Sequence, residues 1–258
     1  VQTMQVGEKA NRNFELTVTN PGGHSSTPID DNAIYQLADA LARVRAYKFP
    51  VRLNATTRAF LERAGAARKD ALGEAMARLA RDPSDGAAEA VLARDRGLNS
   101  MLRTTCVATM LDGGHATNAL PQRAKATVNC RIVPGEDAET TAAALRGAIA
   151  DPKVAVDLVG RIRPVAVSPP LNPAILKPAE ALVARHFPGV PLLPSMSTGA
   201  TDATYLALVN IPTYGVPGLW GDPDGNGAHG LDERMAVRAV YAGRDMLFDL
   251  VKAYADAG

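Results

Sequence analysis

The chain has 258 residues, of which 47% are hydrophobic and 21% are charged, a composition typical of a globular protein with a substantial core. Its formal net charge is +1, and no basic block is interleaved with aromatic residues, which argues against a nucleic-acid partner. The longest apolar stretches are shorter than the roughly 18 residues that a membrane span needs, and no signal peptide is visible, so we expect no membrane partner.

The first part of the chain predicts alternating strands and helices. Residues 12–20 alternate apolar and polar side chains, a period-two pattern that predicts a strand. The loop GGHSSTP, residues 22–28, follows this strand. Asp30 or Asp31 is then expected to cap a helix that ends near Arg45.

The segment 55–96 is rich in Ala, Arg and Leu at helical spacing, so we expect three short helices broken at Gly and Pro. Two strands, a helix and a last strand are expected next, in the order 101–111, 123–133, 134–150 and 153–162. Leaving the helical segment aside, the order is strand–helix–strand–strand–helix–strand. This order predicts an antiparallel α+β sandwich.

The last third of the chain follows a proline-rich linker and has a different character. We expect a helix, a strand, a helix, a strand and a long final helix, at 173–187, 190–193, 201–208, 210–215 and 232–255. This is an α/β pattern, but it has too few strands for a complete sheet.

The two cysteines lie on two of the candidate strands around one turn. Cys106 and Cys130 could therefore face each other. Two cysteines are too few for a disulfide framework, so we expect two reduced thiols in the core, with a disulfide as the alternative.

Three of the four histidines lie in loops where their neighbours are mostly small, in contrast to His186, which ends a helix where it suits the helix dipole. His229, in GNGAHGLDE, precedes the final helix, whose start Asp232 and Glu233 are expected to cap. A short loop that holds an imidazole at a fixed point suits a metal ligand, and a hydrogen-bonding loop histidine is the alternative. One histidine cannot form a zinc site, because such a site takes about four donors.

Two further patterns bear on the chemistry. The segment TGATDA, residues 198–203, places Gly between small hydroxylated residues just before a helix, where backbone amides could hold an anion or a carboxylate. A plain helix cap by Thr or Asp is the alternative. Ser25 and Ser26 neighbour His24, but no G-x-S-x-G elbow exists, so a serine hydrolase is not expected.

Taken together and in order, the motifs GGHSSTP, GGHATNALP followed by RAKATVNCRIVPGED, STGATDA and GAHGLDE resemble the M20 family of metallopeptidases. The likeness is greatest to its carboxypeptidase S and aminoacylase-like members and covers nearly the whole chain. It implies an α+β lid or dimerisation domain, ferredoxin-like with helices on an antiparallel sheet, at residues 10–165, with a helical insertion at about 45–100. Residues 166–258 would form an incomplete α/β portion of a zinc peptidase catalytic domain.

The resemblance also implies roles for individual residues. His229 matches a ligand of one of two zinc ions. His24 matches a lid histidine that reaches an active site, in many members that of the dimer partner, and stabilises the oxyanion. Asn118 and Arg131 match lid residues that engage the substrate, and the planar guanidinium of Arg131 suits a carboxylate.

Gly199 and Thr201 match a turn that lines the substrate pocket of the family. Ala200 replaces a glycine that is common there, which puts a close backbone contact at that position in doubt. His115 matches no family role.

The activity implied is hydrolysis of an amide bond in a small peptide or N-acyl amino acid by a zinc-dependent homodimer that associates through the lid. In the family, most metal ligands and the catalytic glutamate precede the lid. We therefore expect this chain to be the C-terminal part of a longer enzyme, inactive alone and binding zinc weakly at most. A non-enzymatic dimerisation or ligand-binding module is the alternative, and the compartment and the substrate side chain stay open.

Overall fold

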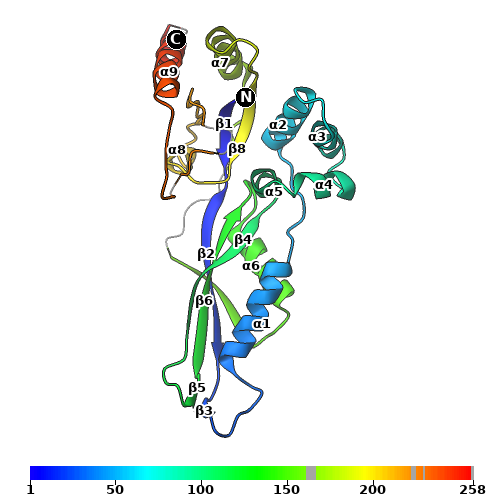
Figure 1. Cartoon of the computed structure of the whole chain (residues 1–258), viewed down its shortest axis with the longest axis vertical. Coiled ribbons are helices and arrows are strands. Elements are labelled where there is room, and N and C mark those ends of the chain that lie inside the picture. The colour runs from blue at the N-terminus through cyan, green and yellow to red at the C-terminus, as the bar shows by residue number, and fades with distance from the viewer. Residues whose placement is uncertain (161–166, 222–224, 229, 257–258) are drawn as a thin grey trace.

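The computed structural model describes residues 1–160, 167–221, 225–228 and 230–256. The fold is elongated, with a twisted sheet forming one half and a group of helices around two paired strands forming the other (Figure 1). Both chain ends lie in the helical half. Among the described residues, no helix combines the length and the apolar character needed to cross a membrane.

The sheet half is a four-stranded antiparallel sheet in the order β4-β6-β2-β7, the ferredoxin-like arrangement that the sequence predicts. Its strands are β2 (Ala10–Thr19), β4 (Thr105–Gly113), β6 (Arg123–Ile132) and β7 (Val154–Val159). Strands β2 and β6 bury every second side chain, as a sheet covered on one face must. Residues 161–162 of the last expected strand lie outside the described residues.

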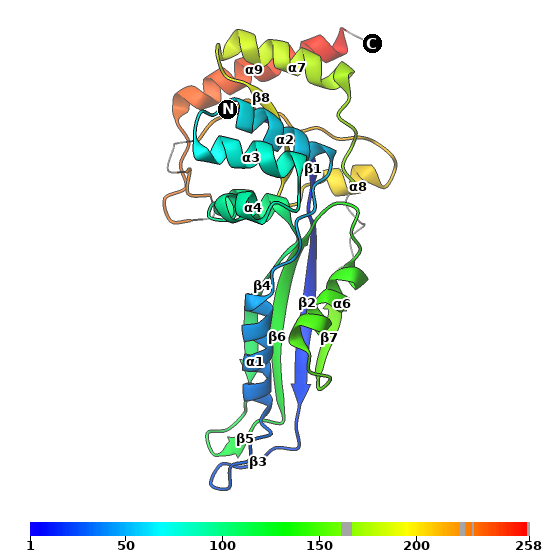
Figure 2. The same cartoon turned by 90° about the vertical axis from the view of Figure 1, so that its right-hand side faces the viewer.

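Two helices, α1 (Ala33–Ala46) and α6 (Ala138–Ile149), cover one face of this sheet (Figure 2). Helix α1 is capped by Asn32, whose side chain accepts a hydrogen bond from the Ile34 amide at 2.9 Å. The prediction of Asp30 or Asp31 as the cap was therefore wrong by one or two residues. Asp31 instead forms an exposed ion pair with Lys153.

The helical insertion contains four helices: α2 (Ala55–Ala66), α3 (Ala71–Arg81), α4 (Gly86–Leu92) and α5 (Arg96–Leu102). The last of these was missed, because the sequence pattern places a strand from residue 101. The Asp95 side chain accepts a hydrogen bond from the Leu98 amide and so starts a helix there. The core of the insertion includes Leu193 from the C-terminal part of the chain, so the insertion packs beside that part.

The helical half is built on β1 (Gln2–Glu8), which pairs in parallel with β8 (Leu192–Ser197). Besides the insertion helices, this half contains α7 (Pro173–His186), α8 (Ala203–Ala207) and α9 (Val237–Ala255). Met4 and Val6 of β1 are completely buried against α7, α9 and β8. Strand β1 was not predicted, although its chain continues almost directly into β2 and joins the two halves.

Two expectations for the last third were wrong. Residues 210–215 form no strand, and only Gly215 makes an isolated bridge, to Gln5. Pro212 lacks an amide hydrogen, and Asn210 has a positive φ of 58°. Neither residue can take part in the regular hydrogen bonding of a β-strand. Helix α9 begins at Val237 without a side-chain cap, so Asp232 and Glu233 do not cap it.

A short ribbon of β3 (Gly23–His24) and β5 (Ala119–Leu120) forms the far tip of the sheet half. This pairing brings the two glycine-rich histidine loops of the lid together, although about 90 residues separate them along the chain.

The two cysteines form a disulfide rather than the reduced thiols that the sequence favours. Cys106 and Cys130 are directly opposite in the β4–β6 register, with their Cα atoms 4.1 Å apart. The expectation was wrong because it came from the small number of cysteines, whereas the strand register decides which side chains meet.

Candidate functional site

The first candidate site lies where β1 ends and meets the turn formed by residues 198–204, called here the 198–204 turn. Glu8 is 4% exposed, and one carboxylate oxygen accepts hydrogen bonds from the Thr201 amide at 2.7 Å and the Thr201 hydroxyl at 2.6 Å. The Thr204 hydroxyl donates to the other oxygen. The turn therefore does hold a carboxylate, and that carboxylate belongs to this chain.

The cap alternative for this turn is met in part, because the Thr201 hydroxyl accepts a hydrogen bond from the amide of Ala203, the first residue of α8, at 3.2 Å. Asp202 stands at the N-cap position of α8, but its side chain makes no capping hydrogen bond. The carboxylate that the α8 end receives comes instead from Glu8, 193 residues away along the chain.

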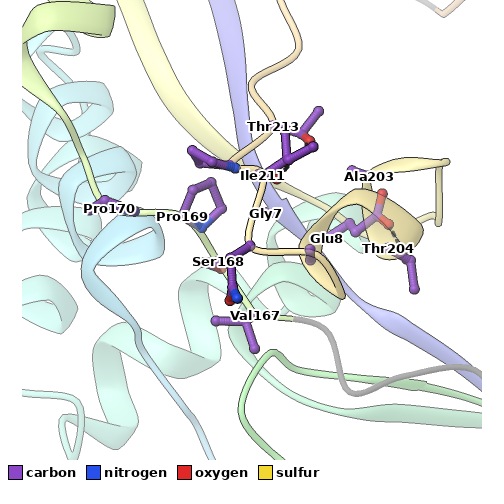
Figure 3. A pocket seen from close by; sticks show the side chains of 13 residues that line it. Gly7, Glu8, Val167, Ser168, Pro169, Pro170, Ala203, Thr204, Ile211 and Thr213 are labelled. Carbon is purple, nitrogen blue, oxygen red and sulfur yellow. Dashed lines mark hydrogen bonds between the residues drawn. The ribbon is translucent and has the colours of Figure 1, made fainter.

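A cavity of about 300 Å³ adjoins this turn (Figure 3). Its walls are mostly apolar, with the polar atoms of Glu8 and Thr204 at one side, and Val167, Pro169 and Ile211 contribute to the apolar part. An apolar wall with a few fixed polar groups is the usual construction of a small-molecule site.

Gly7 makes this construction possible. It has φ +106°, and a Cβ atom there would lie 2.2 Å from the Ser168 hydroxyl oxygen, so the lining segment can approach β1 only because residue 7 is glycine.

A second group of predicted site residues lies at the tip ribbon. His24 is exposed, and its Nδ1 atom accepts a hydrogen bond from the Ser26 amide at 3.2 Å and lies 2.8 Å from the Ser26 hydroxyl. With Nδ1 used as an acceptor, Nε2 is the nitrogen left to donate outward. Asn118 is also exposed, and its backbone carbonyl accepts a hydrogen bond from the backbone amide of Ser25 at 3.0 Å.

Arg131 lies on β6 at the other end of the sheet, half-buried and near Lys9. Lys9 is fully buried, and within the described part of the chain its Nζ atom donates to the hydroxyls of Ser100 and Thr105, both at 3.4 Å. Burial, and then the positive charges of Arg131 and Arg103, lower the pKa of Lys9 to about 7. Three basic side chains thus lie close together at this end of the sheet, and one of them, Arg103, is paired with Glu89.

Sequence reasoning missed both Glu8 and Lys9. The signal available was their position between the apolar residues of β1 and the alternating pattern of β2, which places two charged residues where the chain passes from one half of the fold to the other. A single sequence does not reveal that both are buried.

The predicted site residues fall into separate groups. Gly199 and Thr201 share the 198–204 turn, where the Gly199 amide donates to the Ser197 hydroxyl at 3.1 Å. His24 and Asn118 share the tip, beyond the far end of β2, and a ten-residue strand spans roughly 30 Å. One copy of the chain does not bring the tip and the turn together.

His229, the predicted metal ligand, lies outside the described residues. Among the described residues, no group of three or more His, Cys, Asp or Glu side chains is placed to hold a metal ion. The donors described here therefore do not fit a zinc site by themselves.

The other two histidines have no catalytic arrangement. His115 is exposed in the tip loop. The Nε2 atom of His186 lies 2.8 Å from the Asp249 carboxylate and joins α7 to α9, and this hydrogen bond lowers the pKa of Asp249. This arrangement agrees with the structural role predicted for His186.

Comparison with known proteins places this geometry in context. Residues 6–157 match the family model of the peptidase dimerisation domain, M20 type. A probable carboxypeptidase S-like protein 2 from Dictyostelium discoideum is 26% identical over 254 residues, which cover 98% of this chain and 48% of the relative. The human N-fatty-acyl-amino acid synthase/hydrolase PM20D1 is 25% identical over 257 residues, which cover 98% of this chain and 51% of the human protein. The chain thus spans about half the length of these curated relatives.

Solved structures show the same fold. The dipeptidase Dug1p from Saccharomyces cerevisiae aligns with a TM-score of 0.64 at 17% identity, covering 99% of this chain and 56% of that one. An M20 family metallo-carboxypeptidase, Sso-CP2 from Sulfolobus solfataricus, also gives a TM-score of 0.64, at 16% identity, covering 98% and 60%.

Proposed function

Because the chain belongs to the M20 peptidase dimerisation-domain family, we propose that it forms the lid and part of the catalytic domain of a zinc-dependent hydrolase. The reaction is hydrolysis of an amide bond in a small peptide or an N-acyl amino acid. The observation that carries the proposal is the match of residues 6–157 to the family, extended by relatives that align over nearly the whole chain. We assign residues 10–165 to the lid and residues 166–258 to the catalytic domain.

The substrate is proposed to lie between the 198–204 turn and the base of the lid. Gly199 and Thr201 present the turn to it, and the apolar cavity beside Glu8 suits an apolar side chain or acyl group. Arg131 has no carboxylate partner among the described ion pairs and can receive one from the substrate. Asn118 lies at the tip, so its side-chain amide is proposed to contact the substrate of a second copy.

His24 is proposed to donate a hydrogen bond from Nε2 to the oxygen that becomes negative during attack on the amide carbonyl. A donor aimed at that oxygen is worth about 2.7–4 kcal/mol in comparable sites. His24 is far from the 198–204 turn of its own chain, which supports a role in the site of a second copy.

A homodimer through the lid would provide that second copy. Strand β4 is an edge of the four-stranded sheet, and its residues Val107, Met110 and Leu111 are 61%, 69% and 71% exposed. An exposed apolar edge strand offers both unpaired backbone groups and apolar area, and this combination favours pairing with another strand. We propose that two β4 strands meet there.

A bound zinc ion would polarise the carbonyl and lower the pKa of the attacking water. His229 is proposed as one ligand. Because the chain spans about half the length of the curated relatives it matches, the remaining ligands and the catalytic base are proposed to come from a longer protein that contains these residues. The 258-residue chain alone is accordingly proposed to be inactive.

The test is an assay of such a longer protein against dipeptides and N-acyl amino acids, including one with a long acyl chain. We expect hydrolysis of at least one amide class, abolished by a chelator and restored by zinc. If the zinc-loaded protein cleaves none of them, the enzyme proposal fails and a dimerisation or ligand-binding module takes its place.

A further inference from the structure

We propose that Glu8 is a positioning residue, which holds the 198–204 turn in the conformation that receives the substrate. The effect on catalysis rests on the proposed function. The contacts between Glu8 and the turn are within this chain and can be tested without an enzyme assay. No sequence motif or family match assigns a role to Glu8.

The side chain of Glu8 is bound mainly by the 198–204 turn. Its two carboxylate oxygens receive the Thr201 amide, the Thr201 hydroxyl and the Thr204 hydroxyl. A fourth donor, the side-chain amide of Gln5, lies 3.3 Å away. Among the described ion pairs, none involves Glu8, so this buried carboxylate depends on these neutral donors for its stabilisation.

The turn in return depends on Glu8. Helix α8 has only five residues, and a helix that short is not stable without tertiary support. Local capping is limited, because the Asp202 side chain makes no capping hydrogen bond, and the Thr201 hydroxyl, which accepts a hydrogen bond from the Ala203 amide at 3.2 Å, is itself bound to Glu8. Glu8 is the acceptor that the structure gives to the Thr201 amide and to the Thr204 hydroxyl. Thr204 is buried, so the loss of this acceptor would leave its hydroxyl without a hydrogen bond to Glu8 in a site that water hardly reaches.

The same contacts shape the cavity. Glu8, Ala203, Thr204 and Ala207 all line it, and the hydrogen bond between Glu8 and Thr204 crosses its polar side (Figure 3). Gly199, whose amide lies in the same turn, is two residues from Thr201. A shift of this turn therefore changes the amides offered to a substrate and the width of the cavity together.

The position of Glu8 also links the turn to the lid. Glu8 ends β1, and Ala10 begins β2, the strand at the centre of the lid sheet. The register of β1 against β8 shifts between Gln5 and Glu8, and the next residue, Lys9, is buried against Thr105 of β4. The turn and the four-stranded sheet are therefore joined through the backbone of two residues, Glu8 and Lys9.

The variant that tests this is Glu8→Gln, which keeps the size of the side chain but replaces one acceptor oxygen with a donor. The matched control is Thr56→Val, which removes a buried hydrogen bond to the Val6 carbonyl, on the same strand, without contact to the turn. Both variants remove buried hydrogen bonding from β1, so a loss that reflects stability alone would appear in both.

The first readout is hydrogen exchange of the Thr201 amide in the 258-residue chain. We expect exchange about 10-fold faster or more in Glu8→Gln, as loss of a charge-assisted hydrogen bond predicts, and little change in Thr56→Val. Equal exchange in the wild type and Glu8→Gln would overturn the proposal, whatever the enzyme assay gives.

The second readout is steady-state kinetics in the longer protein. We expect Glu8→Gln to raise KM about 10- to 100-fold with a smaller change in kcat, while Thr56→Val lowers the unfolding temperature and leaves KM unchanged. An unchanged KM in Glu8→Gln would overturn the positioning role. Absence of hydrolysis by the wild type refutes the proposed function instead, and the exchange result then decides the structural claim alone.

Discussion

Among single residues in the described part of the chain, Lys9 has a strongly shifted pKa. Its side chain is fully buried, Arg131 and Arg103 are the charged neighbours that act on it, and its pKa is lowered to about 7. A lysine in this setting gives up its proton far more readily than one in water, because the charged form loses hydration and meets other cations.

Lys9 makes stability depend on pH in a definite direction. Between pH 7 and the ordinary lysine pKa of 10.5, the unfolded chain binds a proton that the folded chain does not. Stability from this group therefore rises with pH in that window, by at most about 1.4 kcal/mol per pH unit, and its contribution is most unfavourable below pH 7. Urea unfolding of the wild type and Lys9→Met at pH 7, 8 and 9 should show the advantage of the variant shrinking as pH rises. Parallel pH profiles would contradict the assignment.

The disulfide gives a second prediction for single residues. The Cys106–Cys130 bond closes a loop with a sequence separation of 24, and a loop of that size contributes about 3.5 kcal/mol in the chain-entropy model. Chemical denaturation with and without reductant should show this loss in the wild type. The double variant Cys106→Ser, Cys130→Ala should show no effect of reductant, and equal sensitivity in the two proteins would be evidence against the bond.

Residue identity alone left several of these features undetermined. Three candidates for the cap of α1, at residues 30, 31 and 32, are all good capping types, and only the backbone geometry selects Asn32. Likewise, Cys106 and Cys130 were recognised as lying on neighbouring strands, but a register shift by one residue would have turned their side chains to opposite faces.

At the scale of elements, the sheet half was largely predictable from sequence. Strands β2 and β6 show the period-two pattern, and α6 begins with Asp137, whose side chain caps it as an N-terminal signal should. Strand β1 was missed because its last three residues are all buried, so its burial does not alternate regularly, and because its partner β8 lies about 190 residues away.

Strand β4 gives the prediction that belongs to this scale. If it is the dimer edge, Leu111→Lys should shift the protein from dimer to monomer, because it places a charge where an apolar strand pair would form. Leu158→Lys on β7, the opposite edge of the sheet, is the control and should leave the dimer intact. The molar mass of each variant is measured by light scattering. If only Leu158→Lys dissociates the dimer, the interface lies at the β7 edge instead.

At the scale of the whole molecule, the separation of the tip from the 198–204 turn is the main finding. The motifs with His24 and Thr201 were both recognised in the sequence, but their distance depends on the length and direction of β2. Because local patterns do not encode that geometry, the sequence indicated these residues as candidates without predicting that one copy keeps them apart.

The proposed action of His24 in a second copy has a direct kinetic consequence. In the longer protein, His24→Ala should lower kcat about 100- to 1000-fold, the cost of losing one oxyanion donor. His115→Ala, in the other tip loop and exposed, should retain full activity. Equal losses in the two variants would indicate a general disturbance of the tip, and no loss in His24→Ala would exclude its catalytic role.

We propose that the metal site of the proposed hydrolase is completed by residues beyond those that the described fold brings together. The direct measurement is the zinc retained, per chain, by the 258-residue protein and by the longer protein after identical dialysis against metal-free buffer. We predict zinc in stoichiometric amount only in the longer protein, together with activity. Stoichiometric zinc and amide hydrolysis in the 258-residue protein alone would contradict the account.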